Sequence, residues 1–275
     1  MEYIHFNFHK ERTIRIYPLP CLHVGVPQSD VKFIKEHLER IQKDPIARWV
    51  YMGDGGDCVT KHSKGGIYEQ ILSPQQQHDL LVSLLTPIRH QGLFGVRGNH
   101  GNRVYKETGL SFDKNLCHRL AIPYLGVSSL ANIIVGRSSY DLYFNHGTDS
   151  GERIQPKVSK AEKFKEFINA DALFTAHSHI CIELPPAVLL QADNIKQIVR
   201  TKLRHQYICG TGYDSRTGYA EDKGYGPLLP AYCSVEFDGR IIRGTAQYGQ
   251  IFRKWQSDGQ HVVNGDYGYV DGRLS

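Results

Sequence analysis

The sequence lacks a long hydrophobic segment, a closely spaced cysteine pair and any repeat or low-complexity tract. Its longest apolar runs, Asn132–Gly136 and Pro186–Leu190, fall far short of the ~20 residues that cross a bilayer. Residues 1–10 also lack the basic segment and apolar stretch of a signal peptide. The six cysteines form no CxxC pair, so neither a zinc ribbon nor a disulfide framework is indicated. These absences predict no membrane association and a reduced, cytoplasmic location.

Neither sign of charge is in large excess. The chain of 275 residues has 33 Lys and Arg against 28 Asp and Glu, a net charge of +5, and 40% of its residues are hydrophobic. This composition is typical of a globular protein and excludes intrinsic disorder. Basic segments at 157–165 and 196–204 are compatible with a phosphate-rich ligand, but solvated helix faces are the favoured interpretation. Charge alone therefore does not identify a nucleic-acid-binding protein.

The order of the expected elements predicts one α/β domain over residues 1–275. We expect strands at 13–19, 48–52, 93–96, 132–135, 142–144 and 172–175, and helices at 29–43, 81–88, 112–120 and 158–168. Ser29 is placed to cap the first helix, and Ala161, Phe164 and Phe167 are spaced to face inward on the last. A motif-bearing part, 12–180, is followed by a strand-rich part, 181–275. Alternating strands and helices predict sheets inside and helices outside.

Chemistry-bearing side chains follow five of the expected strands, where an open α/β sheet gathers its ligands. The segments are Cys21-Leu22-His23, Gly53-Asp54-Gly55-Gly56-Asp57, Gly98-Asn99-His100, Asn145-His146-Gly147 and Ala176-His177-Ser178-His179. A single buried histidine is usually a core residue, and a Gly-Asp pair is usually a turn. Together, however, the five segments form a mixed nitrogen and oxygen set suited to two transition-metal ions that share one carboxylate.

In this order the segments resemble the pattern of the calcineurin-like metallophosphoesterases: DxH, GDxxD, GNH followed by an acidic residue, a lone His, and GHxH. The match runs from Arg12 to about His179. Gly210–Tyr213 and Tyr219–Glu221 are similar to the strand-rich end of phage-encoded members, which would act in the host cytoplasm. The resemblance implies an α/β fold built as a four-layer α/β/β/α sandwich, with two metals at the mouth between the sheets.

The resemblance also implies two ligand sets for divalent Mn, Fe or Zn ions, with Asp54 bridging. The first set is Cys21, His23, Asp54 and His179, and the second is Asp54, Asn99, His146 and His177. His100 is implied as the proton donor to the leaving group. Asp57 would accept from its other ring nitrogen and keep the imidazole cationic. For Arg97 and Arg103 a phosphate clamp and a structural ion pair are equally open.

Two positions depart from the family pattern. Cys21 stands in place of an aspartate, and Gly101-Asn102 stand where an acidic residue commonly follows GNH. A thiolate carries the same single negative charge as a carboxylate and binds Zn²⁺ or Fe²⁺ well, but Mn²⁺ and Mg²⁺ poorly. Cys21 is therefore expected as a ligand, against the alternative of a degraded or single-metal site.

The expected function is a metal-dependent phosphohydrolase that uses a hydroxide held between two metals. We favour a phosphodiesterase acting on nucleic acid or a nucleotide, as in the nuclease branch of the family. A phosphomonoesterase acting on a nucleotide or phosphoprotein is one alternative, because Arg97–His100 is similar to the serine/threonine phosphatase branch. Cys58, however, replaces that branch's arginine. A non-catalytic binding module is the other alternative.

Overall fold

The computed structural model describes residues 1–63, 66–148, 153–193, 198–216, 218–222, 224, 226–240 and 251–257. The strands are β1 (Glu2–Phe8), β2 (Thr13–Leu19), β3 (Ala47–Tyr51), β4 (Gly92–Gly95), β5 (Ser128–Val135), β6 (Ser138–Asn145), β7 (Ala172–Thr175), β8 (Cys181–Asp193), β9 (Ile198–Thr211), β10 (Ala231–Asp238) and β11 (Ile251–Ser257). The α-helices are α1 (Val31–Lys43), α2 (Pro74–Leu85), α3 (Asn99–Thr108), α4 (Phe112–Arg119), α5 (Ile154–Glu162), α6 (Phe164–Phe167) and α7 (Tyr219–Asp222), with short 3-10 helices η1 (Ile67–Glu69) and η2 (Thr86–Gln91).

The strands form one hydrogen-bonded sheet in the order β1-β5-β6-β7-β9-β10-β2-β3-β4, with β8 added to β9 and β11 to β10. Two runs within it are parallel: β2 with β3 and β4, and β6 with β7 and β9. The carboxyl ends of neighbouring parallel strands meet at one edge. The loops that follow β2, β3, β4, β6 and β7 carry the five predicted ligand segments.

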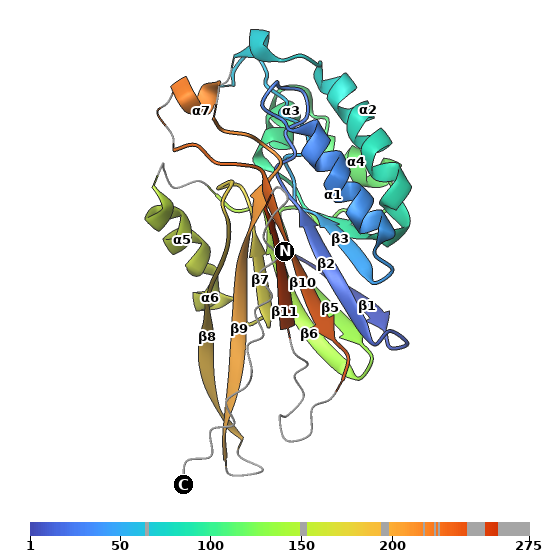
Figure 1. Cartoon of the computed structure of the whole chain (residues 1–275), viewed down its shortest axis with the longest axis vertical. Coiled ribbons are helices and arrows are strands. Elements are labelled where there is room, and N and C mark those ends of the chain that lie inside the picture. Colours follow the sequence, from blue (N-terminus) through green and yellow to red (C-terminus); the bar gives the residue numbers. More distant parts are fainter. Residues whose placement is uncertain are drawn as a thin grey trace.

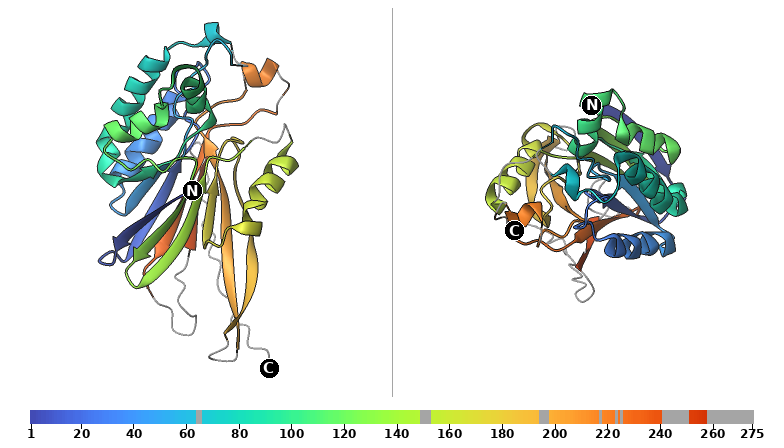
Figure 2. Two further views of the ribbon diagram at one scale, coloured as in Figure 1. Left: turned by 180° about the vertical axis from the view of Figure 1, so that it is seen from behind. Right: turned by 90° about the horizontal axis from the view of Figure 1, so that it is seen from above.

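The sheet bends so that its two halves pack against each other. One buried cluster joins apolar side chains of β2–β4 to those of β5–β7, and the Phe94 and Phe144 rings meet edge to face with centroids 5.2 Å apart. A second cluster packs α1, α2 and α4 on the outer side of β2 and β3, while smaller clusters join α5 and α6 to the other half. Helices thus lie outside both halves (Figures 1 and 2). The predicted α/β fold class is confirmed.

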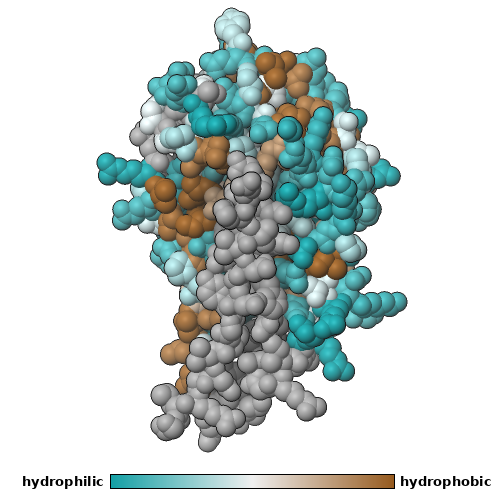
Figure 3. All heavy atoms as spheres, in the orientation of Figure 1, coloured by the Kyte–Doolittle hydropathy of each residue, from teal (hydrophilic) through white to brown (hydrophobic). Residues whose placement is uncertain are grey.

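Helix α1 shows why the sequence forms this layer. Ile34, Leu38 and Ile41 recur at helical spacing and are fully or nearly buried, whereas its charged residues face solvent. Figure 3 shows hydrophilic side chains over this helix and apolar ones along the opposite edge of the molecule. In the described part of the chain, no helix is long and apolar enough to cross a membrane.

The predicted cap of this helix is wrong. Asp30, not Ser29, is the N-cap, and its carboxylate accepts a hydrogen bond from the Phe33 amide at 2.9 Å. The Ser29 hydroxyl instead donates to the carbonyl of Leu22 at 2.8 Å. Ser29 therefore holds the loop between Cys21 and His23 against the start of α1.

One further prediction is wrong, and two elements of the structure were not predicted. The helix expected at 158–168 is two helices, α5 and α6, and Phe167 is 63% exposed instead of facing inward. Strand β1, which pairs in parallel with β5, was not expected from the sequence. Helix α3 was not expected either, because it begins at Asn99 in a segment with glycines at 98 and 101.

The capping assignment is testable. We expect Asp30→Ala to lower the free energy of unfolding by about 1 kcal/mol, because it removes the acceptor for an otherwise unpaired helix amide. Urea unfolding followed by tryptophan fluorescence measures this, with Lys35→Ala on the exposed face of α1 as the control. A change for Asp30→Ala no larger than that of the control would contradict the assignment.

Candidate metal centre

Backbone hydrogen bonds bring the ligand segments together. The Cys21 amide donates to the Gly53 carbonyl and the His23 amide to the Asp54 carbonyl, both at 3.0 Å. From the C-terminal part, the Gly212 amide and the Thr211 hydroxyl both donate to the carbonyl of Cys21, at 3.0 and 2.9 Å. The first two loops and the end of β9 are therefore fixed to one another independently of any bound ion.

The backbone at the centre is strained. Among the described residues, seven that are not glycine have a left-handed backbone, and Ala121 is the only one of them outside this region. The other six are Cys21, His23, Asp54, Cys58, His177 and His179, with φ between 48° and 66°. Such conformations cost about 1–3 kcal/mol each and persist where the surroundings enforce them. Their concentration at five of the predicted ligands indicates a functional constraint on this loop cluster.

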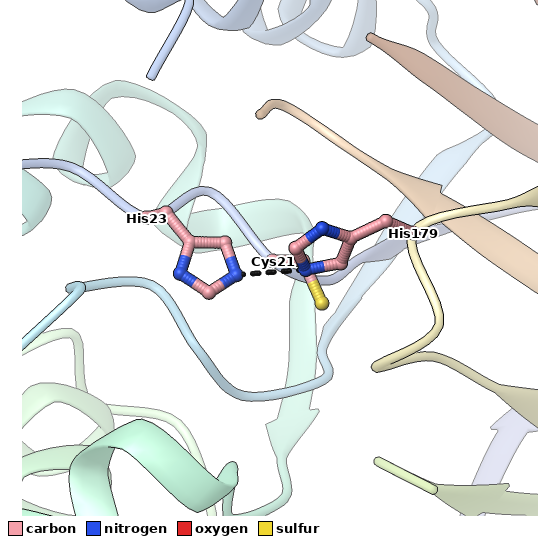
Figure 4. A group of neighbouring side chains, drawn as sticks. All are labelled: Cys21, His23 and His179. Carbon is pink, nitrogen blue, oxygen red and sulfur yellow. Dashed lines mark hydrogen bonds between the residues drawn. The ribbon is translucent and has the colours of Figure 1, made fainter. Parts of the chain in front are cut away.

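Cys21, His23 and His179 form the first cluster (Figure 4), and their ligand atoms lie within 4.8 Å of one another. The Nε2 atoms of the two histidines are 3.0 Å apart. Burial lowers the pKa of both imidazoles, and nearby histidines lower it further: His100 acts on His23, and His23 and His177 act on His179. Because Asp57 Oδ1 lies 3.2 Å from Nδ1 of His23, the proton of a neutral His23 belongs on Nδ1. Its Nε2 lone pair then faces His179.

Cys21, Asp54 and His146 form the second cluster, again within 4.8 Å. Asp54 Oδ1 accepts a hydrogen bond from the His100 amide at 2.8 Å. Asp54 Oδ2 lies 2.9 Å from Nε2 of His146, yet it is buried without a hydrogen bond of acceptable geometry in the described structure. Burial opposes ionisation of Asp54, but the positive charge of His146 and His100 lowers its pKa well below the usual range.

The contacts of His146 also bring acceptor atoms close together. Its Nδ1 lies 2.6 Å from the Met52 carbonyl, which can only accept, so Nδ1 carries a proton. In the neutral ring, Nε2 would then present a lone pair to Asp54 Oδ2 and to Asn99 Oδ1, 3.0 Å away. Burial favours the neutral ring, but Asp54 raises the pKa of His146 overall. A cation among these atoms would satisfy all three, so the donor set fits a divalent transition metal.

The predicted acid His100 has defined partners. Its Nδ1 lies 2.6 Å from the carbonyl of Asp57 and 3.3 Å from Asp57 Oδ1. Burial disfavours the charged form of Asp57, but hydrogen bonds with His100 and His23 lower its pKa overall. The Asp57 carboxylate therefore interacts with both imidazole rings. The guanidinium of Arg103 lies 3.2 Å from His100 Nε2.

The remaining predicted residues are placed less centrally. The rings of His177 and His146 pack edge to face with centroids 5.3 Å apart, but His177 belongs to none of the three ligand-atom clusters found among the described residues. His100 does belong to one, with His23 and Asp54, although it is not an expected ligand. Arg97 lines a groove between α3 and α4.

Asp113 was not among the predicted site residues, and it is buried on α4. Its Oδ1 accepts from the Tyr51 hydroxyl at 2.7 Å and its Oδ2 from the Gly98 amide at 3.3 Å, and burial raises its pKa to about 7. A Cβ at Gly101 would lie 2.3 Å from Asp113 Oδ2. The carboxyl of Asp113 thus fills the space beside position 101, where the family pattern has its acidic residue. An acid on the apolar face of a helix is the sequence feature that points to it.

Tyr213 and Gln70 also contact residues of the candidate metal centre. The ring of Tyr213 packs against those of His23 and His179, with centroids 5.5 and 5.6 Å away. Gln70 donates to Asp57 Oδ2 at 2.8 Å. Tyr213 belongs to the glycine-rich segment noted in the sequence, whereas nothing in the sequence distinguishes Gln70.

No protein-family model matches the sequence, and no curated protein is significantly similar to it. Similar solved structures include Vacuolar Protein Sorting 29 from Cryptosporidium parvum, at 11% identity and a TM-score of 0.45, covering 93% of this chain and 98% of that one. A metallophosphoesterase from Sphaerobacter thermophilus has 14% identity and a TM-score of 0.38, with 87% of each chain covered. GAP50 of Plasmodium has 10% identity and a TM-score of 0.45, with 92% of this chain and 89% of that one covered.

Proposed function

We propose that the chain is a metal-dependent phosphohydrolase, and more specifically a phosphodiesterase acting on nucleic acid or a nucleotide. The observation that carries the proposal is the buried Asp54 Oδ2, which makes no hydrogen bond of acceptable geometry although His146 Nε2 lies 2.9 Å away and the Cys21 thiol shares its ligand-atom cluster. Evolution rarely retains an unpaired buried carboxylate oxygen in a purely structural role, because its desolvation is costly. A bound cation removes that cost.

Cys21, His23, Asp54 and His179 would hold one ion, and Asp54, Asn99 and His146, with His177, a second. When bound, such ions would stabilise the charge of a phosphoryl group and lower the pKa of a water molecule. The chain's own part is to fix the ligand atoms. Asp57 holds His23 and the Met52 carbonyl holds His146, so that each presents Nε2 to the centre.

Proton transfer falls to His100 in this proposal. In the absence of substrate, Arg103 donates to His100 Nε2. An anionic phosphate is a stronger acceptor than a neutral imidazole, so Arg103 would turn to the substrate. Nε2 would then be free to take up a proton from solvent, and the resulting imidazolium, with Nδ1 still bonded to the Asp57 carbonyl, would give that proton to the leaving alkoxide.

The preference for diesters rests on charge. Two divalent ions with one carboxylate, one thiolate and one hydroxide sum to about +1, which matches a diester monoanion. Turnover of bis-p-nitrophenyl phosphate, p-nitrophenyl phosphate, single-stranded DNA and cyclic nucleotides in Mn²⁺ tests this preference. Faster monoester than diester turnover would favour a phosphomonoesterase. Bound metal without turnover of any of the four would favour a binding module.

Asp54→Asn is expected to be the most damaging single change. It removes the only carboxylate shared by both ligand sets, so metal content and activity should fall together. Elemental analysis of the purified variant and bis-p-nitrophenyl phosphate turnover measure both quantities. Asp79→Asn, which affects only an exposed carboxylate, is the control. Normal metal content and turnover in Asp54→Asn would rule out the bridging role.

His100→Asn should keep its metal and lose about 10²–10⁴ in kcat on substrates with poor leaving groups, the usual range for a general acid. Nitrophenolate leaves without protonation, so nitrophenyl esters should be less affected. His118→Asn, an exposed histidine on α4, controls for the substitution. Equal losses on both substrate types would argue against the acid role, and metal loss would make His100 a ligand, as its place in the third cluster allows.

Cys21 determines metal preference in this proposal. Burial raises the pKa of its thiol, so ligation must displace the proton, and metal affinity should rise with pH. Cys21→Asp should shift the preference from Zn²⁺ towards Mn²⁺, and Cys21→Ala should weaken the first site, as measured by titration calorimetry. Cys117→Ala removes a buried thiol outside the centre and is the control. Unchanged stoichiometry and preference in Cys21→Ala would eliminate the thiolate ligand.

A further inference from the structure

A groove lies between α3 and α4, next to the candidate metal centre. Its cavity is about 630 Å³, and its lining includes Arg97, Tyr105, Ser111, Lys114 and Tyr124. We propose that this α3–α4 groove binds one nucleoside phosphate unit of a single-stranded nucleic acid. Arg97 and Lys114 would bind the phosphate, and Tyr105 and Tyr124 the base. The inference rests on the proposed function, because it extends that substrate away from the reacting phosphate.

The charge of the groove favours an anion. Arg97 and Lys114 both line it, and none of its lining residues is acidic. Neither cation forms an ion pair with any residue that the structure describes. Arg97 is half-buried, which limits the positions available to its guanidinium, whereas Lys114 is exposed. A half-buried guanidinium and an exposed ammonium that line the same groove suit a phosphate group, which accepts from both.

The aromatic residues favour a base over other groups carried by phosphate. Tyr105 is 50% exposed, so much of its ring is available to a ligand. Tyr124 is half-buried and packs against the outer apolar cluster, which holds its ring in place. Stacking on aromatic side chains contributes about 1–3 kcal/mol per base and tolerates any base. A phosphopeptide would use the two cations but not the rings.

The groove is continuous with the centre through the backbone. Arg97 precedes the proposed ligand Asn99 by two residues, and α3 runs from Asn99 past His100 to Tyr105, which lines the groove. At 1.5 Å per residue, Tyr105 is about 8 Å along the axis from His100. A strand whose phosphodiester lies at the centre therefore has a neighbouring nucleotide within reach of the groove.

Binding without catalysis tests the inference. The full-length protein in EDTA is titrated into a fluorescein-labelled 12-nucleotide oligothymidylate, and anisotropy gives the dissociation constant. We expect Lys114→Glu to weaken binding about tenfold or more, because it reverses one phosphate contact. Lys35→Glu on α1, an equal charge change at an exposed site, should have little effect. Tyr105→Ala should weaken oligothymidylate binding about 5- to 100-fold while leaving competition by inorganic polyphosphate unchanged.

Equal effects of Lys114→Glu and Lys35→Glu would overturn the inference, because they would show only a general charge effect. An unaltered affinity in Tyr105→Ala, or equally strong competition by a phosphoserine peptide, would overturn the nucleoside assignment. Turnover of bis-p-nitrophenyl phosphate in Mn²⁺ is measured separately. Groove-dependent oligonucleotide binding by a wild-type protein without turnover would support the groove and contradict the catalytic proposal, so the two failures are distinguishable.

Discussion

The close approach of the Asp54 loop to the start of α3 is the constraint on which the rest of the centre depends. The Asp54 carboxylate accepts the His100 amide, and a Cβ at Gly98 would lie 2.1 Å from the same carboxylate oxygen. A Cβ at Gly53 would lie 2.3 Å from the Gly98 nitrogen. The two glycines therefore permit a contact that no other residue pair allows. Through it, one carboxylate both caps α3 and directs its second oxygen towards the histidines.

This contact explains why order in the centre does not need an ion. Backbone hydrogen bonds join the loops after β2 and β3, and carbonyl or carboxylate acceptors orient His23, His100 and His146. One charge remains unbalanced, because Asp54 Oδ2 is buried without a hydrogen bond of acceptable geometry. Rigid ligand atoms with unbalanced charge are the conditions that favour tight binding of a cation, since little reorganisation is required.

The fold class and the convergence of the five loops at one sheet edge were predictable because both follow from short-range rules. Strand ends place the loops, and helical spacing identifies α1 and its buried face. The failures came from contacts distant in sequence. Helix α3 begins in a segment with poor helix propensity, and its first turn is stabilised by Asp54. The Ser29 hydroxyl donates to the carbonyl of Leu22 instead of capping α1.

The position of Asp113 has a consequence for how such chains diverge. An acid at position 101 and Asp113 would compete for the same space, since a Cβ at 101 already collides with the Asp113 carboxylate. Losing Asp113 first would leave the buried Tyr51 hydroxyl and Gly98 amide without an acceptor, at about 1–3 kcal/mol each. A chain that moves the carboxylate from one position to the other would pass through one of these two costly states. A glycine after Asn-His is therefore compatible with a carboxylate that Asp113 supplies from α4.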